Sequence, residues 1–205
     1  MPRIARVVGI GLPHHITQRG NYRQEVFVDD YDRNQYLSWI EDYSQRYCLT
    51  ILAYCLMENH VHFVAIPEQN DSLAKTFNTA HMRYAQYFNN KRKVRGHLWQ
   101  GRFYSCVLDE PQLMVAVKYI ERNPVRAKLV KKPWQWKWSS AQAHVDKKVL
   151  AIINAEKLFE IIAWSCADWK NYIRDQDDDK AIDVIRKNNL TGRPLGSNKF
   201  VCKLE

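Results

Sequence analysis

The sequence predicts an α+β fold in which a ferredoxin-like antiparallel sheet carries helices on one face, followed by a helical C-terminal extension. Short segments rich in β-branched and aromatic residues alternate with longer segments of helical periodicity. Their order is β-α-β-β-α-β-α, which resembles a split β-α-β arrangement. From about residue 146 the strand signals stop and two helical stretches follow. We therefore expect a domain over residues 1–145 and an extension over residues 146–205.

Four segments have the composition of strands and end at turn or breaker residues: 13–20, 48–57, 60–66 and 103–108. The second and third are separated only by Glu58-Asn59, and so short a connection predicts a β-hairpin.

Five segments show apolar and aromatic residues at helical spacing: 31–47, 72–90, 111–122, 156–173 and 179–188. Side chains that can cap a helix N-terminus stand at the start of three of them, namely Asp29-Asp30, Ser72 and Asp109. Pro124 limits the third helix, because a residue before proline avoids the helical conformation.

Charge and composition narrow the class of protein. The chain has 205 residues with 31 Lys and Arg against 22 Asp and Glu, a net charge of +9 that favours an anionic partner. No apolar run reaches the roughly 18 residues of a membrane-spanning helix, and the N-terminus lacks the apolar core of a secretory signal. The five cysteines form no Cys-x-x-Cys pair, which argues against a disulfide framework or zinc ribbon and favours the cytoplasm.

A pair of histidines, His60 and His62, lies within one predicted strand. Side chains alternate across a strand, so both imidazoles point to the same face. Two adjacent imidazoles make half of a divalent-metal site if oxygen ligands complete the shell. The same pattern also fits two partly exposed histidines without any metal.

Tyr119 and Asn123 are four residues apart on a predicted helix and therefore share a face. A tyrosine beside a metal can act as a nucleophile, because a nearby cation favours the phenolate. Asn123 would then supply an oxygen ligand one turn away. Taken alone, a tyrosine on an amphipathic helix is usually a core residue. We expect the other histidines to have structural roles: His14, His15, His81, His97 and His144.

Together these blocks resemble the REP-associated tyrosine transposases, a branch of the HUH single-tyrosine transposases of bacterial insertion sequences. The resemblance covers about residues 5–200. It rests on separated motifs: HHITQRGNYRQEVF (14–27), YCLMENHVHFV (54–64), GHLWQGRFYSCVLD (96–109), YIERNPVRAKLV (119–130), WSSAQAH (138–144) and TGRPLGS (191–197). One departure is Glu58, where many relatives have proline; we interpret it as a turn residue.

The resemblance implies a mechanism. His60, His62 and Asn123 would bind Mg²⁺ or Mn²⁺, and Tyr119 would attack a scissile phosphate in single-stranded DNA. The products would be a 5′-phosphotyrosine link and a free 3′-OH, and reversal of the step would rejoin DNA without ATP. Residues 1–145 would then be the catalytic domain, in a protein of the bacterial cytoplasm associated with the nucleoid.

The implied substrate is a REP element, a short palindrome that folds into a hairpin. Phosphates require cations and single strands favour stacked aromatic rings. The loop from Lys91 to Arg102 contains both, including His97 and Trp99. We expect DNA contacts from the arginines around this loop and the first strand: Arg3, Arg6, Arg19, Arg23, Arg95 and Arg102.

The extension carries two further signals. The acidic run 175–179 would repel DNA, which suits a linker or a shield, and Gly192-Arg193-Pro194 resembles a minor-groove hook.

Three alternatives to a transposase stay open: a non-cleaving DNA-binding protein, a rolling-circle initiator or relaxase, and a hydrolytic metal nuclease. Monomer and homodimer are both compatible with the sequence.

Overall fold

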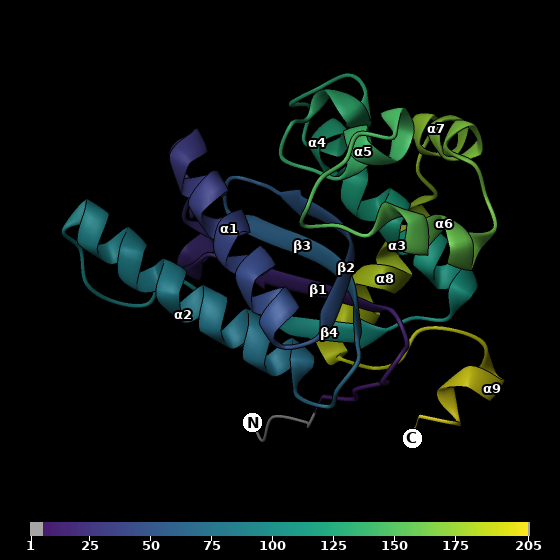
Figure 1. The fold of residues 1–205 in the computed structure, drawn as a ribbon, viewed down its shortest axis with the longest axis horizontal. Coiled ribbons are helices and arrows are strands. Elements are labelled where there is room, and N and C mark those ends of the chain that lie inside the picture. The colour runs from purple at the N-terminus through teal and green to yellow at the C-terminus, as the bar shows by residue number, and fades with distance from the viewer. Residues whose placement is uncertain (1–5, 205) are drawn as a thin grey trace.

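A four-stranded antiparallel sheet lies between two layers of helices in the computed structural model, which describes residues 6–204 (Figure 1). The strands stand in the order β2-β3-β1-β4, and all neighbours are antiparallel. Their bounds are β1 (His14–Arg19), β2 (Leu49–Leu56), β3 (His60–Pro67) and β4 (Tyr104–Val107). The predicted α+β class and the hairpin of β2 and β3 are confirmed.

The helices follow the predicted order. Their bounds are α1 (Asp30–Arg46), α2 (Ser72–Arg92), α3 (Glu110–Glu121), α4 (Asn123–Arg126), α5 (Ala141–Asp146), α6 (Ala155–Ile162), α7 (Cys166–Arg174), α8 (Asp179–Thr191) and α9 (Asn198–Val201), with short 3₁₀ turns at η1 (Asn21–Arg23) and η2 (Pro133–Gln135). Asp29 and Asp109 cap α1 and α3 through their carboxylates, as predicted. The helix predicted over 156–173 is broken, because Ala163 takes a left-handed φ of 52° and Ser165 caps a new helix.

Helices cover both faces of the sheet, so the prediction that they lie on one face was wrong. On one face, Ile51, Tyr54 and Phe63 pack against α1 and α2. On the other face, Cys55 and Val64 pack with α3 and the helices of the extension. Strands that are apolar on both faces need two covering layers. In Figure 1, α1 and α2 lie apart from the group formed by α3 to α8.

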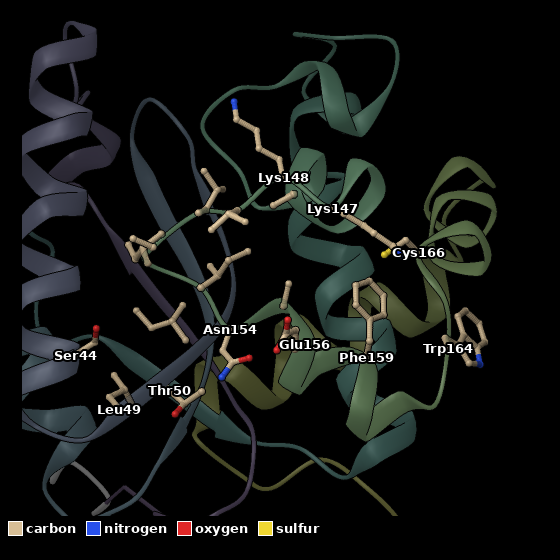
Figure 2. A pocket seen from close by; sticks show the side chains of 18 of the residues that line it. Ser44, Leu49, Thr50, Lys147, Lys148, Asn154, Glu156, Phe159, Trp164 and Cys166 are labelled. Carbon is tan, nitrogen blue, oxygen red and sulfur yellow. The ribbon is translucent and has the colours of Figure 1, made fainter.

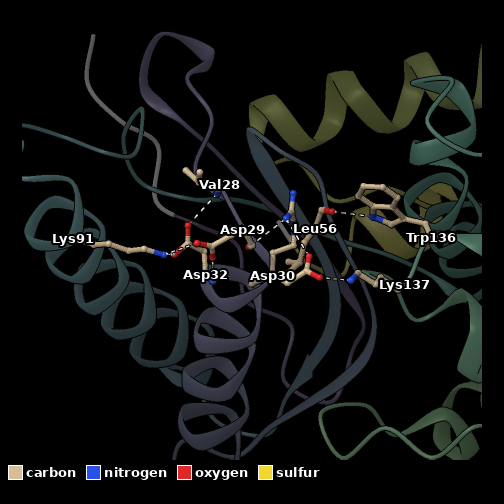
Figure 3. Close-up of polar contacts among 9 residues, drawn as sticks. Val28, Asp29, Asp30, Asp32, Leu56, Lys91, Trp136 and Lys137 are labelled. Atoms are coloured by element: carbon tan, nitrogen blue, oxygen red, sulfur yellow. Dashed lines mark hydrogen bonds and ion pairs between the residues drawn. The ribbon is translucent and has the colours of Figure 1, made fainter.

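Polar contacts join the start of α1 to the end of α2 (Figure 3). Asp32 is 1% exposed and accepts from Lys91 Nζ at 2.6 Å and from the Tyr87 hydroxyl at 2.8 Å. Lys91 also pairs with Asp29 at 2.8 Å. These carboxylates raise the pKa of Lys91 and keep it charged. We expected DNA contacts from the loop that begins at Lys91, but the Lys91 ammonium group instead joins α2 to α1 through these ion pairs.

A buried carboxylate, that of Glu121, fastens the end of α3. It accepts from His144 Nδ1 at 2.6 Å, from the Ser140 hydroxyl at 2.6 Å and from Trp169 Nε1 at 3.0 Å. Glu121 and His144 are completely buried, and His144 Nε2 lies 3.1 Å from the carbonyl of Leu52. Strand β2, the segment 139–144 and α7 are therefore tied to one side chain of α3. His144 has the structural role expected of it.

The extension completes the second layer instead of standing apart from it. Trp169, Ile173, Ile182 and Ile185 are buried in the same apolar cluster as the inner side of α3. Among residues 6–204, no helix has the length and apolar character needed to cross a bilayer.

The segment after α8 pairs with the outer edge of β4. Leu195 forms a parallel bridge with Leu108, its N–H donates to the Val107 carbonyl at 2.8 Å, and its carbonyl accepts from Asp109 N–H at 3.1 Å. The Cys106 thiol donates to the Arg193 carbonyl. The backbone of the Gly192-Arg193-Pro194 motif is thus part of the fold, whereas the Arg193 side chain is exposed.

We predict that Glu121→Ala lowers the free energy of unfolding by about 3–5 kcal/mol, because it leaves several buried donors without an acceptor. Urea unfolding followed by circular dichroism measures this change. The control is Glu25→Ala, which removes an exposed carboxylate and should stay within about 0.5 kcal/mol of the parent. Equal effects of the two substitutions would contradict this account of the network.

Candidate active site

Strand pairing places His60 and His62 together on the face of the sheet that α3 covers. In the β1–β3 ladder, Thr17 stands opposite His62 and Arg19 opposite His60. The two imidazole centroids are 5.0 Å apart with an interplanar angle of 86°. His62 is 5% exposed and His60 is half-buried. The two imidazole rings therefore lie on the same face of the sheet, as predicted.

Tyr119 of α3 lies beside this pair. Its ring centroid is 5.5 Å from that of His62, and the two rings meet edge to face at 86°. Tyr119 is 7% exposed. One chain therefore brings together the predicted nucleophile and a predicted metal ligand, without help from a second copy.

His15, for which we expected a structural role, lies in the same cluster. Its Nε2 lies 2.9 Å from His62 Nδ1, and the rings stack with centroids 5.2 Å apart. The Tyr119 ring is 5.8 Å away. His15 was missed because its position depends on β1 lying beside β3, an order that spacing along the chain does not reveal. The other expected structural roles hold for His14, which bonds to nearby backbone, and for His81, which bonds to the Tyr36 hydroxyl.

The remaining ring nitrogens decide what the histidines can bind. His60 Nδ1 lies 2.6 Å from Asn59 Oδ1, so this nitrogen carries the proton and Nε2 keeps its lone pair. If His62 Nδ1 donates to His15 Nε2, His62 Nε2 is free in the same way. Metal-bound histidines commonly donate from the other ring nitrogen, an arrangement that orients the ring. With His62 Nδ1 as the donor, His15 is the acceptor that would orient His62.

Burial keeps these imidazoles neutral. It lowers the pKa of His60 to about 4 and that of His15 to about 3, and it moves the pKa of His62 well below its usual range. The neighbouring cations Arg19 and Arg126 lower the pKa of His60 further. Neutral imidazole is the form that coordinates a metal ion.

Asn123 provides an amide group close to the end of α3. The intervening Arg122 has helical angles, so α4 continues the turn and Asn123 follows Tyr119 by about one helical turn. Asn123 is half-buried and its Nδ2 has no hydrogen-bond partner. Rotation of the amide exchanges nitrogen for oxygen, so this unpartnered group fits an oxygen ligand.

If a cation binds to His60 and His62, it needs at least one further ligand, such as an oxygen atom. Across the described part of the chain, no three His, Cys, Asp or Glu side chains converge as a metal site. His60 and His62 supply two imidazole donors, and a divalent cation bound to them would need oxygen ligands to complete its shell.

Two arginines that sequence reasoning missed surround Tyr119. The guanidinium of Arg126 is 4.4 Å from the centroid of the Tyr119 ring and donates to the Tyr119 carbonyl. The guanidinium of Arg186 in α8 lies 5.9 Å from the same centroid, and a hydrogen bond with Tyr119 raises the pKa of Arg186. Arg126 follows Tyr119 by seven residues, or two helical turns, a spacing that could have revealed it.

Asp177 links the acidic run to this region. It forms ion pairs with Arg122 at 2.9 Å and with Arg126 at 3.2 Å, and its side chain is only 10% exposed. Arg122 also donates to the carbonyls of Ile173 and Arg174. The chain between α7 and α8 is therefore fastened beside the helix that carries Tyr119.

The arginines predicted to contact DNA occupy different environments. Arg3 lies outside the described residues. Arg6 stacks on Phe103 at 3.6 Å and donates to its carbonyl, and burial together with the charge of Arg102 lowers the pKa of Arg6 to about 10. The other four are exposed: Arg19, Arg23, Arg95 and Arg102. Arg19 is the one placed opposite His60.

The aromatic residue of the basic loop is not available for stacking. Trp99 is 8% exposed, and its Nε1 donates to the His81 carbonyl at 2.9 Å. Our expectation that Trp99 offers a stacking surface for bases was therefore wrong, because the core under α2 takes up this ring. The loop instead borders a cavity of about 660 Å³, whose wall includes His97 and Arg102.

A larger cavity of about 940 Å³ lies elsewhere, between the edge of β2 and the chain leading into α6 and α7 (Figure 2). Thr50, Asn154 and Phe159 are among its lining residues, and no histidine is. It contains none of the predicted site residues, so size alone does not identify the active site in this fold.

The sequence pattern of IS200-like transposases matches residues 10–123, more than half of the chain. The chain belongs to this family. The matched region includes the four residues predicted to form the site: His60, His62, Tyr119 and Asn123.

A solved structure shares the fold of this transposase. A REP-associated tyrosine transposase bound to a REP hairpin superposes with a TM-score of 0.58 and 20% identity, over 75% of this chain and 92% of that chain. A putative transposase from Deinococcus radiodurans aligns with a TM-score of 0.41 and 17% identity, over 62% of this chain and 92% of that chain. No curated protein matches the sequence.

We predict that His15→Ala weakens Mn²⁺ binding by about 10–100-fold, because His62 loses the partner that orients its ring. His15→Gln should retain more affinity, since its amide oxygen still accepts a hydrogen bond. Isothermal titration calorimetry measures both, with the exposed His97→Ala as the control. An unchanged Mn²⁺ affinity in a folded His15→Ala protein would rule out the orienting role.

Proposed function

We propose that this transposase belongs to the REP-associated branch and cleaves and rejoins single-stranded DNA at hairpin elements through a 5′-phosphotyrosine intermediate. The observation that carries the proposal is the approach of His62 and Tyr119, whose centroids are 5.5 Å apart, with His60 alongside. A tyrosine buried against two neutral histidines and two guanidinium groups is arranged for nucleophilic attack on phosphate.

The reaction starts from the Tyr119 hydroxyl. Its oxygen loses a proton and forms a bond to the scissile phosphorus, while the bond to the 3′ oxygen breaks and that oxygen takes up a proton. Mg²⁺ or Mn²⁺, held by His60, His62 and Asn123, supplies Lewis-acid polarisation of the phosphate when bound. Attack of a 3′-OH on the phosphotyrosine reverses the step and joins DNA.

The arginines beside Tyr119 have a defined task in this reaction. Arg126 and Arg186 place positive charge at the ring in which negative charge develops; Tyr119 is 7% exposed and the Arg126 side chain 19%, whereas the Arg186 side chain is 54% exposed. Fixed charges of this kind are more effective there than in bulk water. They stabilise the phenolate and then the phosphate that becomes attached to it.

A hairpin substrate is supported by the fold shared with the REP-hairpin complex and by the net charge of +9. The exposed Arg19 and Arg23 stand at the end of β1 next to His60, where a strand entering the site would pass. Arg95 and Arg102 extend this positive surface along the loop before β4.

Since one chain supplies both Tyr119 and the histidines, a monomer is sufficient for cleavage, and a homodimer is not required. Such a protein would work on the nucleoid in the bacterial cytoplasm.

We predict that the protein forms a covalent, protease-sensitive adduct with end-labelled single-stranded DNA that carries a REP hairpin, in the presence of Mg²⁺ or Mn²⁺. Tyr119→Phe should abolish the adduct, because phenylalanine has no oxygen to attack phosphorus. A denaturing gel measures it, with Tyr104→Phe on β4 as the matched control.

Each other outcome of that assay identifies an alternative. Cleavage that persists in Tyr119→Phe would indicate a hydrolytic nuclease that uses activated water. Tight hairpin binding without any adduct in the parent protein would indicate a non-cleaving DNA-binding protein.

We predict that Arg126→Gln slows single-turnover cleavage by about 10²–10³-fold while hairpin affinity changes little, because the loss falls on charge that develops during the reaction. The control Asp177→Asn removes the same ion pair but leaves the guanidinium at Tyr119. It should slow cleavage by less than about tenfold. Equal slowing by both variants would show that Arg126 acts only through the Asp177 contact.

A further inference from the structure

Tyr22 is the most exposed of the large apolar and aromatic side chains described, at 95%. It lies in the 3₁₀ turn η1, between the end of β1 and the start of α1. Large aromatic side chains are normally buried for most of their area, so a ring left in water at a conspicuous position calls for an explanation outside the core.

The backbone under Tyr22 adopts an unfavourable conformation. Tyr22 has φ 49° and ψ 25°, and the next residue, Arg23, has φ 61°. Residues with a Cβ rarely occupy this left-handed region, and two in succession are rarer still. Strain of this kind persists only where surrounding contacts impose it, and it concentrates at functional sites.

Those surrounding contacts are present on both sides of the turn. Gly20 N–H donates to the Asn59 carbonyl at 2.8 Å, and Asn21 N–H donates to the Leu98 carbonyl at 2.8 Å. The Gln24 side chain donates to the same Leu98 carbonyl at 3.1 Å. The turn is therefore clamped between the β2–β3 connection and the loop before β4, and Tyr22 stands on a rigid base.

Asn59 connects this turn to the active site. Its Nδ2 donates to the Arg23 carbonyl at 3.2 Å, while its Oδ1 accepts from His60 Nδ1 at 2.6 Å. One amide thus fixes both the strained turn and a predicted metal ligand. Two exposed cations stand on either side of Tyr22 along the chain, Arg19 and Arg23, and neither has a carboxylate partner within the described chain.

We propose that Tyr22 is a base-stacking residue: its ring holds an unpaired nucleobase of single-stranded DNA, while Arg19 and Arg23 contact the phosphates on either side. This contact sets the path by which the strand reaches His60, His62 and Tyr119. Every base has a flat face, so the contact supplies affinity and position with little selection of sequence. The inference rests on the proposed function, because it assigns a binding residue to the same DNA substrate.

The first test is affinity in the presence of EDTA, where no cleavage occurs. The probes are a fluorescein-labelled oligothymidine of about 12 nucleotides, within the usual size of single-strand sites, and the same DNA as a blunt duplex. Tyr22→Ala should weaken binding of the single strand by about tenfold and leave duplex binding unchanged. Tyr22→Trp should retain the affinity, because an indole ring stacks at least as well.

The matched control is Tyr31→Ala, which removes another exposed tyrosine, 62% exposed, from the start of α1. It should leave the affinity for both probes unchanged. Equal losses in Tyr22→Ala and Tyr31→Ala, or loss of duplex binding as well, would overturn the stacking role.

The second test is direct. The same oligothymidine with single 5-iododeoxyuridine substitutions is irradiated on the protein in EDTA, and cross-linked peptides are identified by mass spectrometry. We expect Tyr22 to be the cross-linked residue, since the iodinated base reacts with an aromatic ring stacked on it. Cross-links that all lie elsewhere would overturn the proposal.

The two proposals fail in different ways. Cross-linking at Tyr22 without any Tyr119 adduct on hairpin DNA would uphold the stacking residue and remove the cleavage function. If Tyr22→Ala forms the Tyr119 adduct as fast as the parent protein and binds DNA as tightly, the cleavage function stands and the stacking role of Tyr22 is overturned. Absence of binding to the oligothymidine and to the hairpin alike would overturn both.

Discussion

The buried carboxylate of Glu121 is the constraint on which the second half of the molecule depends. It ends α3 and gathers donors from His144, Ser140 and Trp169, which belong to two later segments of the chain, 139–144 and α7. Those contacts fix α3 across the sheet face that bears the histidines. Tyr119 lies two residues before Glu121 on the same helix, so the position of the proposed nucleophile follows from a network that does not itself include Tyr119 or the site histidines. Structural and functional demands thus meet within one helical turn.

Much of the site could be predicted from the sequence, because it depends on local periodicity. Alternation along a strand places His60 and His62 together, and one helical turn relates Tyr119 to Asn123. His15 could not be found this way, since its contact with His62 requires β1 to lie beside β3. The second layer of helices was missed for a similar reason: β2 and β3 are apolar on both faces, and spacing alone does not say which later helices cover the second one. Trp99 was misjudged because a position in a basic loop says nothing about the core beneath it.

The positive charge of the protein is distributed unevenly between structural and accessible groups. Lys91, Arg122 and Arg126 are engaged by carboxylates, and these cations help to hold the helices in place. Four exposed arginines stand at the end of β1 and on the loop before β4: Arg19, Arg23, Arg95 and Arg102. The net charge therefore overstates the positive charge that is available to contact DNA. The positions of the exposed cations are more informative. The acidic segment 175–179 is not simply a repulsive tail, because Asp177 is bound beside α3.

The pairing of Leu195 with the outer edge of β4 affects whether molecules of this protein associate with one another in solution. An uncovered edge strand presents unpaired N–H and C=O groups, and it invites sheet-to-sheet association between molecules. The segment after α8 satisfies the groups at Val107 and Asp109 and leaves that edge closed. A chain cut short before α8 would lose Ile182 and Ile185 from the apolar cluster and gain a free edge at the same time. Its aggregation would then be mistaken for loss of DNA binding, so the role of the extension is better studied by single substitutions than by truncation.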